Sequence, residues 1–493
     1  MRTLARDLAG RLPSTDPDGL ARDLEGALSP FSRLLEHWSV QVRPVPVQAA
    51  GIVLMSAMLT PDTAPETVSE TVRHPARDPA GGTAPGWRSA AAATLASVVA
   101  GGQGASLVAA LQSCLGELAE RLSLVSRGPG DPRVRSGADL DAHLEAGDLL
   151  GFSAAQEQDL ARRHPRLLEA MRGGRIDWRS LSDRWLVAQP WEGGAPVAVL
   201  ALGQLLGEGR WAGLAGLPLA SSVGTAVWTD PQTAADRALA EAAERDAVGL
   251  WWYNRLGITP VAQGVWQGVL PEICASWFRE RRRATEVALL PSRLSQHVVM
   301  AVSWLGEEHA DVAGTRIVPG TGARTGARTG ALTGAMTGAT TGHGTVAGFA
   351  AGADAAAAIR SAIGELIQAE AMLELRLAAA ARAGRPAGTP DLAPVIDLRR
   401  LLQRDGGSPS PLPRLPHPFQ PGALADSLRR QGIRLYRLDL ACDDIGLSCM
   451  KVVSPDLVDW VPRFGRARLQ AEALAAGRKP RDEADLARHP FPF

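Results

Sequence analysis

The sequence contains almost no lysine. Of the 52 basic residues, only Lys451 and Lys479 are lysines, and all the others are arginines. No Gly-Lys-Ser/Thr phosphate loop can therefore exist, and no lysine lies in a strand ahead of a kinase-like catalytic loop. If the protein uses a nucleotide, arginine side chains and carboxylate-bound metal ions must handle its phosphates.

The sequence also has no net charge, and its histidines and cysteines do not cluster in metal-binding patterns. The 52 acidic residues balance the basic ones, which gives no general attraction to nucleic acid or to an anionic membrane. Nine histidines show no His-Glu-x-x-His pattern, and residues 220–224 lack the first glycine of a nucleophile elbow. The four cysteines form no Cys-x-x-Cys pair, which suits a reducing compartment better than a disulfide framework.

Long apolar runs are also missing. The longest uncharged stretch, residues 89–116, is rich in Ala, Gly and Ser, and residues 101–104 interrupt it, so it is too weakly apolar to span a membrane. The first residues lack the apolar stretch of a signal peptide. We therefore expect a soluble, cytoplasmic protein.

One helical pattern, in contrast, occurs three times. Residues 110–121, 234–245 and 358–369 align without a gap, and their acidic anchors Glu117, Glu241 and Glu365 are 124 residues apart. Each anchor follows an apolar residue by two positions and a small residue by one. We call these segments the signature helices.

The first two signature helices carry the sequence Glu-x-x-Glu-Arg, and the third ends in Glu-x-x-Gln. The residues of the two complete copies are Glu117, Glu120, Arg121, Glu241, Glu244 and Arg245. Carboxylates three residues apart lie on one helix face, so two such helices brought together would form a cluster of four carboxylates flanked by two arginines. That cluster fits Mg²⁺ and a polyphosphate, whereas a single copy would more often be a solvated helix face.

The remaining pattern favours an α/β or α+β fold, because helical and strand-like segments alternate along the chain. We expect an N-terminal region over residues 1–85 and a second domain over residues 86–493. Strands are expected at 52–59, 197–202, 434–440 and 448–453. Helices are expected at 105–125, 154–172, from Pro231 onward, and at 271–287.

Three other segments have simpler interpretations. Thr-Gly-Ala-x repeats over residues 321–342 predict a flexible loop covering about 315–345. The aromatic run Trp251-Trp252-Tyr253 favours core packing, and the arginines among residues 279–283 favour a solvated face.

Taken together, the motifs resemble those of the YcaO family from about residue 86 to the end. The matching residues in the first two signature helices are Ser113, Glu117, Glu120, Arg121, Glu241, Glu244 and Arg245, followed by Trp251-Trp252. The stretch 438–457 also resembles the family. The tail 488–493, with Pro490 and Pro492, is similar to the proline-rich C-terminus of its cyclodehydratases.

The resemblance implies a YcaO-like ATP site without a phosphate loop. Glu117, Glu120, Glu241 and Glu244 would bind Mg²⁺, and Ser113, Arg121, Arg245 and Glu365 would bind ATP. Pro490, Pro492 and the carboxylate of Phe493 would assist proton transfer during catalysis.

The implied activity is ATP-dependent cyclodehydration of a ribosomally made precursor peptide, in which Cys, Ser or Thr residues become azolines. The implied partners are that precursor, a leader-binding protein and a flavin dehydrogenase, and a homodimer is compatible with the pattern. One alternative is a related enzyme that forms a thioamide or an amidine with an external nucleophile. Another is a non-catalytic scaffold that binds the precursor or a partner protein.

The scaffold alternative is motivated by three departures from the family pattern. Thr233 stands where many relatives have an acid, and Gln103 stands where they have a lysine. In the third signature helix, Ser361 occupies the position of the family arginine.

Overall fold

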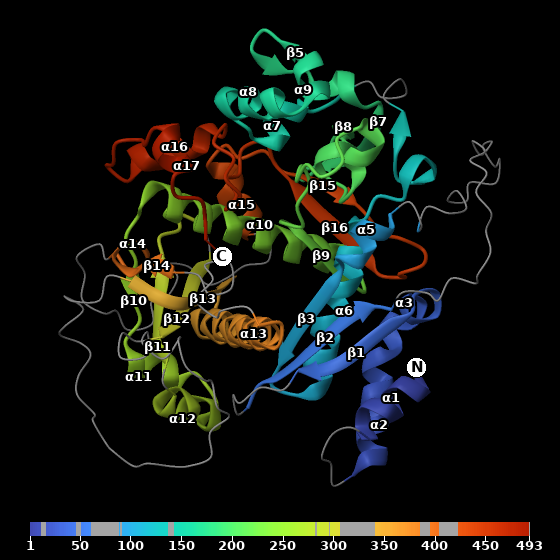
Figure 1. The fold of residues 1–493 in the computed structure, drawn as a ribbon, viewed down its shortest axis with the longest axis vertical. Helices are drawn as coiled ribbons and strands as arrows, with labels where there is room; N and C mark the ends of the chain where they lie inside the picture. The colour runs from blue at the N-terminus through green and yellow to red at the C-terminus, as the bar shows by residue number, and fades with distance from the viewer. Residues whose placement is uncertain are drawn as a thin grey trace. The chain divides into compact units, whose positions relative to one another are not determined.

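Helices and sheets of the α/β class make up the protein (Figure 1), as the sequence predicts. The computed structural model describes residues 1–10, 16–45, 51–60, 88, 91–136, 142–281, 283–294, 296–305, 341–384, 395–403 and 423–492. The chain forms two compact units. Unit 1 comprises residues 1–46, 52–250 and 419–490, and unit 2 comprises residues 47–51, 251–418 and 491–493.

Unit 1 begins with helices packed beside an antiparallel sheet of the order β1-β2-β3. The elements are α1 (Arg2–Gly10), α2 (Pro17–Leu28), α3 (Ser32–His37), β1 (Val40–Val45), β2 (Val53–Leu59), α5 (Ala92–Ala96), β3 (Val99–Gly104) and α6 (Leu107–Leu124). Buried side chains from residues 5–57 and 91–125 join in one hydrophobic core. The domain boundary expected near residue 85 falls among residues 61–87, outside the described residues.

The first signature helix, α6, lies directly on the glycines of β3. A Cβ atom on Gly102 would collide with the backbone nitrogen of Cys114 and lie 2.5 Å from the carbonyl oxygen of Ala110. At Gly104, a Cβ would lie 2.6 Å from the nitrogen of Ala110. Only glycine lets the helix backbone approach the strand this closely.

A second sheet of unit 1 has the order β4-β7-β15-β16-β9, with β8 beside β7. Its strands are β4 (Arg135–Ser136), β7 (Arg184–Pro190), β8 (Val197–Leu200), β9 (Thr225–Trp228), β15 (Tyr436–Asp439) and β16 (Ser448–Val453). The strand predicted at 448–453 is confirmed, and those at 197–202 and 434–440 are confirmed with shorter ends. Helix α6 also contacts β9, and the second signature helix, α10 (Pro231–Asn254), follows β9 in the chain.

The remaining elements of unit 1 are short. They are α7 (Ala146–Leu150), α8 (Ala154–Arg163), α9 (Pro165–Glu169), β5 (Met171–Arg172), β6 (Arg175–Ile176), α15 (Ala423–Arg430), α16 (Ala467–Ala475) and α17 (Glu483–Ala487). The helix predicted over 154–172 is therefore interrupted at His164, resumes as α9, and is wrong only beyond Glu169. Pro165 prevents an unbroken helix, because proline disfavours the helical conformation of the preceding residue, and His164 is extended at that point.

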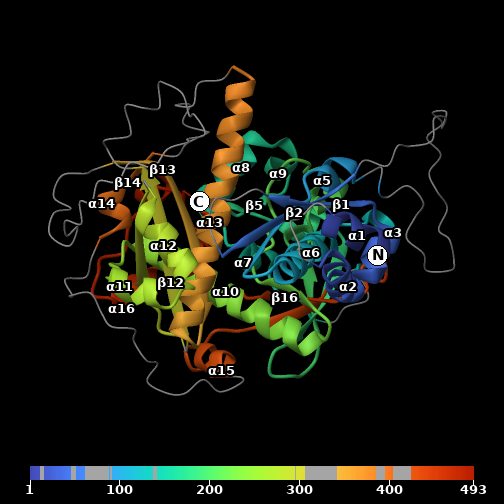
Figure 2. The same cartoon turned by 90° about the horizontal axis from the view of Figure 1, so that it is seen from below.

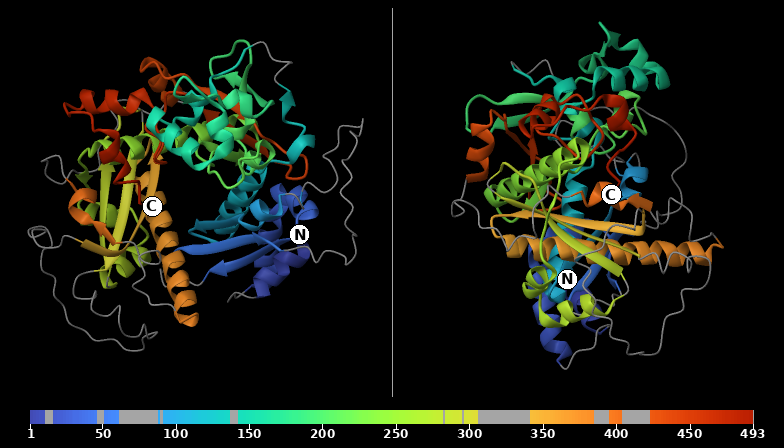
Figure 3. Two further views of the ribbon diagram at one scale, coloured as in Figure 1. Left: turned by 45° about the horizontal axis from the view of Figure 1, so that its top comes forward. Right: turned by 90° about the vertical axis from the view of Figure 1, so that its left-hand side faces the viewer.

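Unit 2 contains an antiparallel sheet of the order β10-β11-β12-β13-β14. The elements are β10 (Thr259–Pro260), α11 (Gln263–Gly268), α12 (Glu272–Glu280), β11 (Arg283–Leu290), β12 (His297–Leu305), β13 (Thr341–Gly352), α13 (Ala355–Arg382), β14 (Val395–Asp397) and α14 (Leu398–Leu401). The third signature helix is α13, which packs on β12 and β13 and extends past one edge of the sheet (Figures 2 and 3).

Two predictions fail around residues 279–287. The helix expected over 271–287 ends at Glu280, and the chain continues as β11, which pairs with β12 along its length. The predicted solvated face holds for Arg279, which is exposed, but it is wrong for Arg281 and Arg283, whose side chains are only 5% and 14% exposed. Arg281 forms an ion pair at 2.7 Å with Glu370 of α13, and Ser303 of β12 donates a hydrogen bond to the same carboxylate.

The low-complexity segment lies outside the described residues up to residue 340, so the predicted loop at 315–345 stays a prediction for most of its length. The aromatic run at 251–253 is buried, as predicted. Among the described residues, no helix combines the length and the apolar character needed to cross a lipid bilayer.

The close contact of α6 with β3 leads to a first prediction. Gly102→Ala should lower the free energy of unfolding by about 2 kcal/mol or more, because the added methyl group meets backbone atoms that cannot move aside. Gly116→Ala, in the middle of α6, is the matched control. Its Cβ would meet only a Val227 methyl at 4.0 Å, so helix propensity should stabilise the protein by up to about 1 kcal/mol. Chemical denaturation measures both, and equal effects would contradict the packing argument.

Candidate functional site

The first signature helix presents its polar residues on one face. Ser106 caps the start of α6 by accepting a hydrogen bond from the backbone of Ala109. Ser113 is exposed on the helix. One turn further on, the Nε of Arg121 donates to Glu117 at 2.6 Å, and a second guanidinium nitrogen of Arg121 donates to the carbonyl oxygen of Val99 at 2.5 Å. Glu117 is partly solvated, with 34% of its side chain exposed.

The second signature helix begins as predicted, with Pro231 in its first turn. The carboxylate of Asp230 accepts a hydrogen bond from the backbone of Thr233 at 2.8 Å, which satisfies a free amide at the helix start. Three turns later Arg245 donates to Glu244 at 2.5 Å and lies 3.5 Å from Glu241. Its guanidinium also stacks on the ring of Trp460 at 3.9 Å, so one face of the arginine packs on an aromatic ring while its nitrogens contact the carboxylates.

Carboxylates of α6 and α10 lie close enough to affect one another. Burial raises the pKa of Glu120 well above its usual range, and the negative charges of Glu117 and Glu241 raise it further. The pKa of Glu241 is raised to about 7, chiefly by burial, with Glu244 and Glu117 adding to the increase and Arg245 opposing it. The acidic residues of the two helices therefore lie close enough to repel one another in a partly desolvated region of unit 1.

Lys451 is a residue of this region that the sequence interpretation missed. Its side chain is almost fully buried, with the residue 3% exposed, and its Nζ donates to the carbonyl oxygen of Ser221 at 2.5 Å. Burial lowers its pKa to about 8, while the charges of Glu241, Glu120 and Asp459 act in the opposite direction. Its rarity was a usable signal, because one of only two lysines lies within the conspicuous stretch 438–457.

The cluster is not a preformed metal cage. Within the described part of the chain, no three Asp, Glu, His or Cys side chains lie close enough together to hold a metal ion. Glu117 and Glu244 are instead paired with the arginines of their own helices. The residues nevertheless suit a divalent cation, because the pKa values of the partly buried Glu120 and Glu241 are raised by desolvation and by neighbouring carboxylates, and an added cation would relieve that repulsion.

A buried ion pair fixes α10 against the C-terminal part of unit 1. Asp246, which is fully buried, pairs with Arg468 of α16 at 3.0 Å and accepts a hydrogen bond from the backbone of Val458. Three residues further along α10, a Cβ on Gly249 would lie 2.6 Å from the carbonyl oxygen of Asp459. Residues 458–460, which carry Asp459 and Trp460, are thus held close to the helix that carries Glu241 and Glu244.

Glu365, the anchor of the third signature helix, lies in unit 2. Its carboxylate accepts a hydrogen bond from the backbone nitrogen of Phe349 at 3.2 Å. The helix again lies on a glycine of the strand before it, because a Cβ on Gly348 would lie 2.8 Å from the Cβ of Glu365. The strand–helix arrangement of β3 and α6 therefore recurs in β13 and α13.

The C-terminal tail is anchored by the aromatic residue between its two prolines. Phe491 packs edge-on against Trp252 at 5.9 Å and at a tilt against Phe349 at 5.7 Å, and its backbone nitrogen donates a hydrogen bond to the Tyr253 hydroxyl at 3.4 Å. Pro490 and Pro492 flank this anchor, whereas Phe493 lies outside the described residues. The aromatic run at 251–253 is thus both core and docking surface for the tail.

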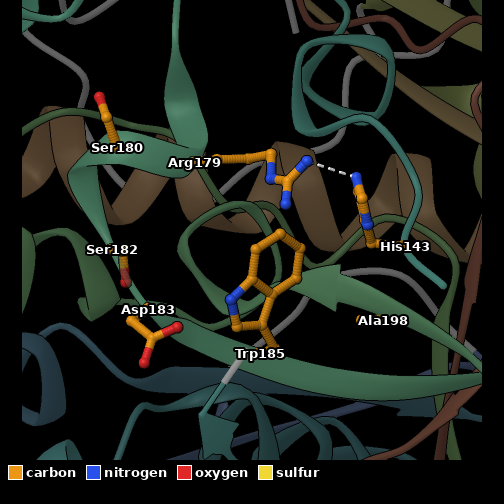
Figure 4. Close-up of a pocket in the computed structure, with 7 residues that line it drawn as sticks. All are labelled: His143, Arg179, Ser180, Ser182, Asp183, Trp185 and Ala198. Atoms are coloured by element: carbon orange, nitrogen blue, oxygen red, sulfur yellow. Dashed lines mark hydrogen bonds between the residues drawn. The ribbon is translucent and has the colours of Figure 1, made fainter. Parts of the chain in front are cut away.

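A cavity of about 300 Å³ in unit 1 lies away from α6 and α10 and is lined by residues 143 and 198 and by residues among 179–185 (Figure 4). Arg179 lies over the ring of Trp185 and donates to the Nε2 of His143 at 2.6 Å. Asp183 and two serines complete its lining. No lining residue comes from α6 or α10, so this cavity is not part of the carboxylate region.

The comparisons with known proteins agree on one family. Residues 101–458 match the model of the YcaO family, described as a YcaO cyclodehydratase that binds ATP and Mg²⁺. No curated protein matches the chain in sequence.

Solved structures show the same fold. A heterocyclase in complex with substrate and cofactor matches with a TM-score of 0.64 and 19% identity, over 95% of this chain and 57% of that one. YcaO from Methanopyrus kandleri, bound with AMPPCP and Mg²⁺, matches with a TM-score of 0.54 and 15% identity, over 89% and 91% of the two chains. The E. coli microcin synthetase McbBCD complex matches at 0.50 and 11%, over 84% and 87%. The chain thus spans little more than half the length of the heterocyclase.

The buried acids predict how stability depends on pH. An unfolded glutamate ionises near pH 4.3, whereas Glu241 in the folded protein ionises at about 7, so the folded state binds more protons between these values. The free energy of unfolding should therefore fall as the pH rises from about 5 to about 8. Thermal unfolding of the metal-free protein measures this fall, which Glu241→Gln should flatten.

The matched control for this experiment is Glu169→Gln, which changes an exposed acid at the end of α9. It should reproduce the native pH profile. A profile for Glu241→Gln that runs parallel to the native one would contradict the assigned burial of Glu241.

Proposed function

The chain belongs to the YcaO family, and we propose that it is an ATP-dependent enzyme that activates backbone amides of a ribosomally made precursor peptide to form azolines. The observation that carries the proposal is the approach of Glu120 and Glu241, from two copies of one motif, in a single desolvated region. Added positive charge would stabilise the ionised forms of these two partly buried acids. A divalent metal ion with a nucleotide is the group that the family description names.

In this proposal the glutamates of α6 and α10 bind the metal ion, and serine and arginine side chains of the same helices bind the nucleotide. Glu117, Glu120, Glu241 and Glu244 hold Mg²⁺, and Ser113 and Arg121 contact ATP from α6. Arg245 neutralises phosphate oxygens while Glu244 and Trp460 keep its guanidinium in place. Glu365 is proposed as a further ATP-binding residue on the basis of the repeated motif.

When bound, ATP would supply the phosphoryl group that turns the amide oxygen of the precursor into a leaving group. The protein's own task is then to orient the reactants and to neutralise charge, which is most of what phosphoryl transfer requires of an enzyme. Pro490 and Pro492, with the carboxylate of Phe493, are proposed to assist proton transfer. The contacts of Phe491 with Trp252 and Phe349 would hold this tail in a defined position.

The partners are proposed by analogy with the matched structures. The heterocyclase contains substrate and cofactor, and the microcin synthetase is a multi-protein complex. By analogy with that complex, we propose that a leader-binding partner protein presents the precursor peptide. A flavin dehydrogenase that oxidises azolines is a further proposed partner.

Neutralising the carboxylates tests the proposal. Glu117→Gln and Glu241→Gln should each abolish precursor-dependent ATP consumption, because a glutamine has no charge with which to hold Mg²⁺. Phosphate release in the presence of precursor and partner protein measures the effect. The surface variant Glu169→Gln should retain native turnover, and undiminished turnover in both site variants would refute the assignment.

A non-catalytic scaffold is the rival that one observation favours, since no three described acids form a ready metal cage. Calorimetry with AMPPCP separates the two functions. The enzyme should bind the nucleotide only with Mg²⁺, and this binding should be lost in Glu241→Gln. A scaffold would show no metal-dependent affinity.

The mass of the modified precursor identifies the chemistry. Azoline formation should remove one water molecule for each modified Cys, Ser or Thr, because the side chain replaces the carbonyl oxygen. Mass spectrometry of the precursor after incubation with ATP measures this change. A mass increase that corresponds to replacement of oxygen by sulfur, with the Cys, Ser and Thr side chains unchanged, would instead identify thioamide formation. That result would contradict the azoline proposal.

A further inference from the structure

A small cavity of about 90 Å³ lies within unit 1, beside the carboxylate region. Ala242, which follows Glu241 on α10, lines it, as does the buried Lys451 of β16. The remaining charged residues of its lining are Asp459, Arg463 and Arg466. Ser221, Ser454 and Gln204 add polar groups to an otherwise mostly apolar wall.

In the described part of the chain, the hydrogen bonds of the two arginines of the cavity all go to backbone carbonyl oxygens, and the Arg463 guanidinium also lies 5.0 Å from the centre of the Phe152 ring. Arg463 donates to the carbonyl oxygens of Leu150, Pro218 and Leu219, at 2.7–3.1 Å. Arg466 donates to the carbonyl oxygens of Asp148, Leu149 and Pro455. Neither arginine forms an ion pair with a carboxylate among the described residues. The Nε of Arg463 is buried and has no hydrogen-bond acceptor in the described structure.

The charges that line the cavity do not balance. Three cationic side chains line it, whereas Asp459 is the one carboxylate of the lining, and its Oδ1 already accepts a hydrogen bond from the backbone of Val461. Outside the lining, the charges of Asp148 and Asp456 also act on Arg466. Buried charges are normally paired, so an unpaired guanidinium in a cavity is costly unless an anion can enter.

The pKa values of Arg463 and Arg466 are both lower than usual, as expected where few negative charges lie nearby. Burial, assisted by the neighbouring Arg463, lowers the pKa of Arg466 to about 10. The pKa of Arg463 is also lowered by burial. An anion between the two guanidinium groups would reverse both changes.

We propose that this cavity is a binding site for a tetrahedral oxyanion of the size of inorganic phosphate. Its volume corresponds to about three water molecules at roughly 30 Å³ each, which leaves room for such an ion but not for a nucleotide. Guanidinium groups suit the oxygens of phosphate because they can donate several hydrogen bonds from one plane. The hydroxyls of Ser221 and Ser454 are further donors in the lining.

The site goes beyond the proposed function, because phosphate binding requires neither precursor nor ATP. Its position would nevertheless suit an enzyme that releases phosphate. The lining includes the α10 residue next to Glu241, so an ion there lies beside the region assigned to the nucleotide.

The test is equilibrium dialysis of the metal-free protein against radiolabelled inorganic phosphate. Saturable binding is expected. Arg463→Met should weaken it by about tenfold or more, since a hydrogen bond to a charged group is lost. Asp459→Asn should tighten it, because the change removes the one carboxylate of the lining and retains an acceptor for Val461. This second variant keeps the test decisive if Arg463→Met fails to fold.

Arg488→Met is the matched control, because it removes an exposed positive charge from the surface of unit 1. Its phosphate affinity should equal that of the native protein. The absence of saturable binding would overturn the proposal, as would binding that neither cavity variant changes.

Competition separates the cavity from the nucleotide site. Phosphate binding that persists in the presence of Mg²⁺ and AMPPCP supports the cavity. Phosphate binding that AMPPCP displaces, and that Arg463→Met leaves unchanged, would place the ion at the nucleotide site and refute the proposal. If the protein binds no AMPPCP, the proposed function fails, while the cavity is still judged by its own variants.

Discussion

The central constraint in unit 1 is the repulsion between acidic side chains of α6 and α10, which lie near one another in a partly desolvated region. Burial is the largest cause of the raised pKa values of Glu120 on α6 and Glu241 on α10, and the charge of Glu117 raises both, while Glu241 also raises the pKa of Glu120. Such an arrangement is unfavourable in itself, so surrounding groups must hold it together. Lys451 and Arg245 supply positive charge from within the same unit, and the Asp246–Arg468 ion pair keeps α10 in place.

A glycine in the preceding strand allows close packing of the first and of the third signature helix. Gly102 of β3 lets the backbone of α6 lie directly on the strand, and Gly348 of β13 does the same for α13. The spacing of the three motifs in the sequence therefore corresponds to a repeated strand–helix arrangement. In unit 2, however, the acidic anchor Glu365 accepts a backbone hydrogen bond from Phe349, and the buried charge pair of its helix, Glu370 with Arg281, lies one to two turns further along.

The helices and their acidic residues were predictable, because periodicity and repetition are local properties of the sequence. Pro231 marks the start of α10 for the same reason, since proline is favoured in a first helical turn. The strand after Glu280 was not predictable in this way. Arg281 and Arg283 are typical of a solvated helix, and only their contacts with Glu370 of α13 and Ser303 of β12 explain their burial.

The parts of the site that sequence reasoning missed come from distant segments. Trp460, Asp459 and Lys451 lie more than 200 residues after Glu241, and no spacing rule links them to α10. They reach the helix because β16 pairs with β9, which immediately precedes α10, and because Gly249 admits the backbone of Asp459. Such contacts depend on sheet topology, which a single sequence does not reveal.

Because Lys451 is buried, chemical labelling of its amine can report when the core of unit 1 opens. Lys479 is exposed on the surface, and no other side chain in the sequence carries a primary amine. An acylating reagent selective for amines will therefore label Lys479 at once but reach Lys451 only when the strand that carries it separates from its neighbours. The ratio of the two labelled peptides would report the local opening of the carboxylate region, without any engineered probe.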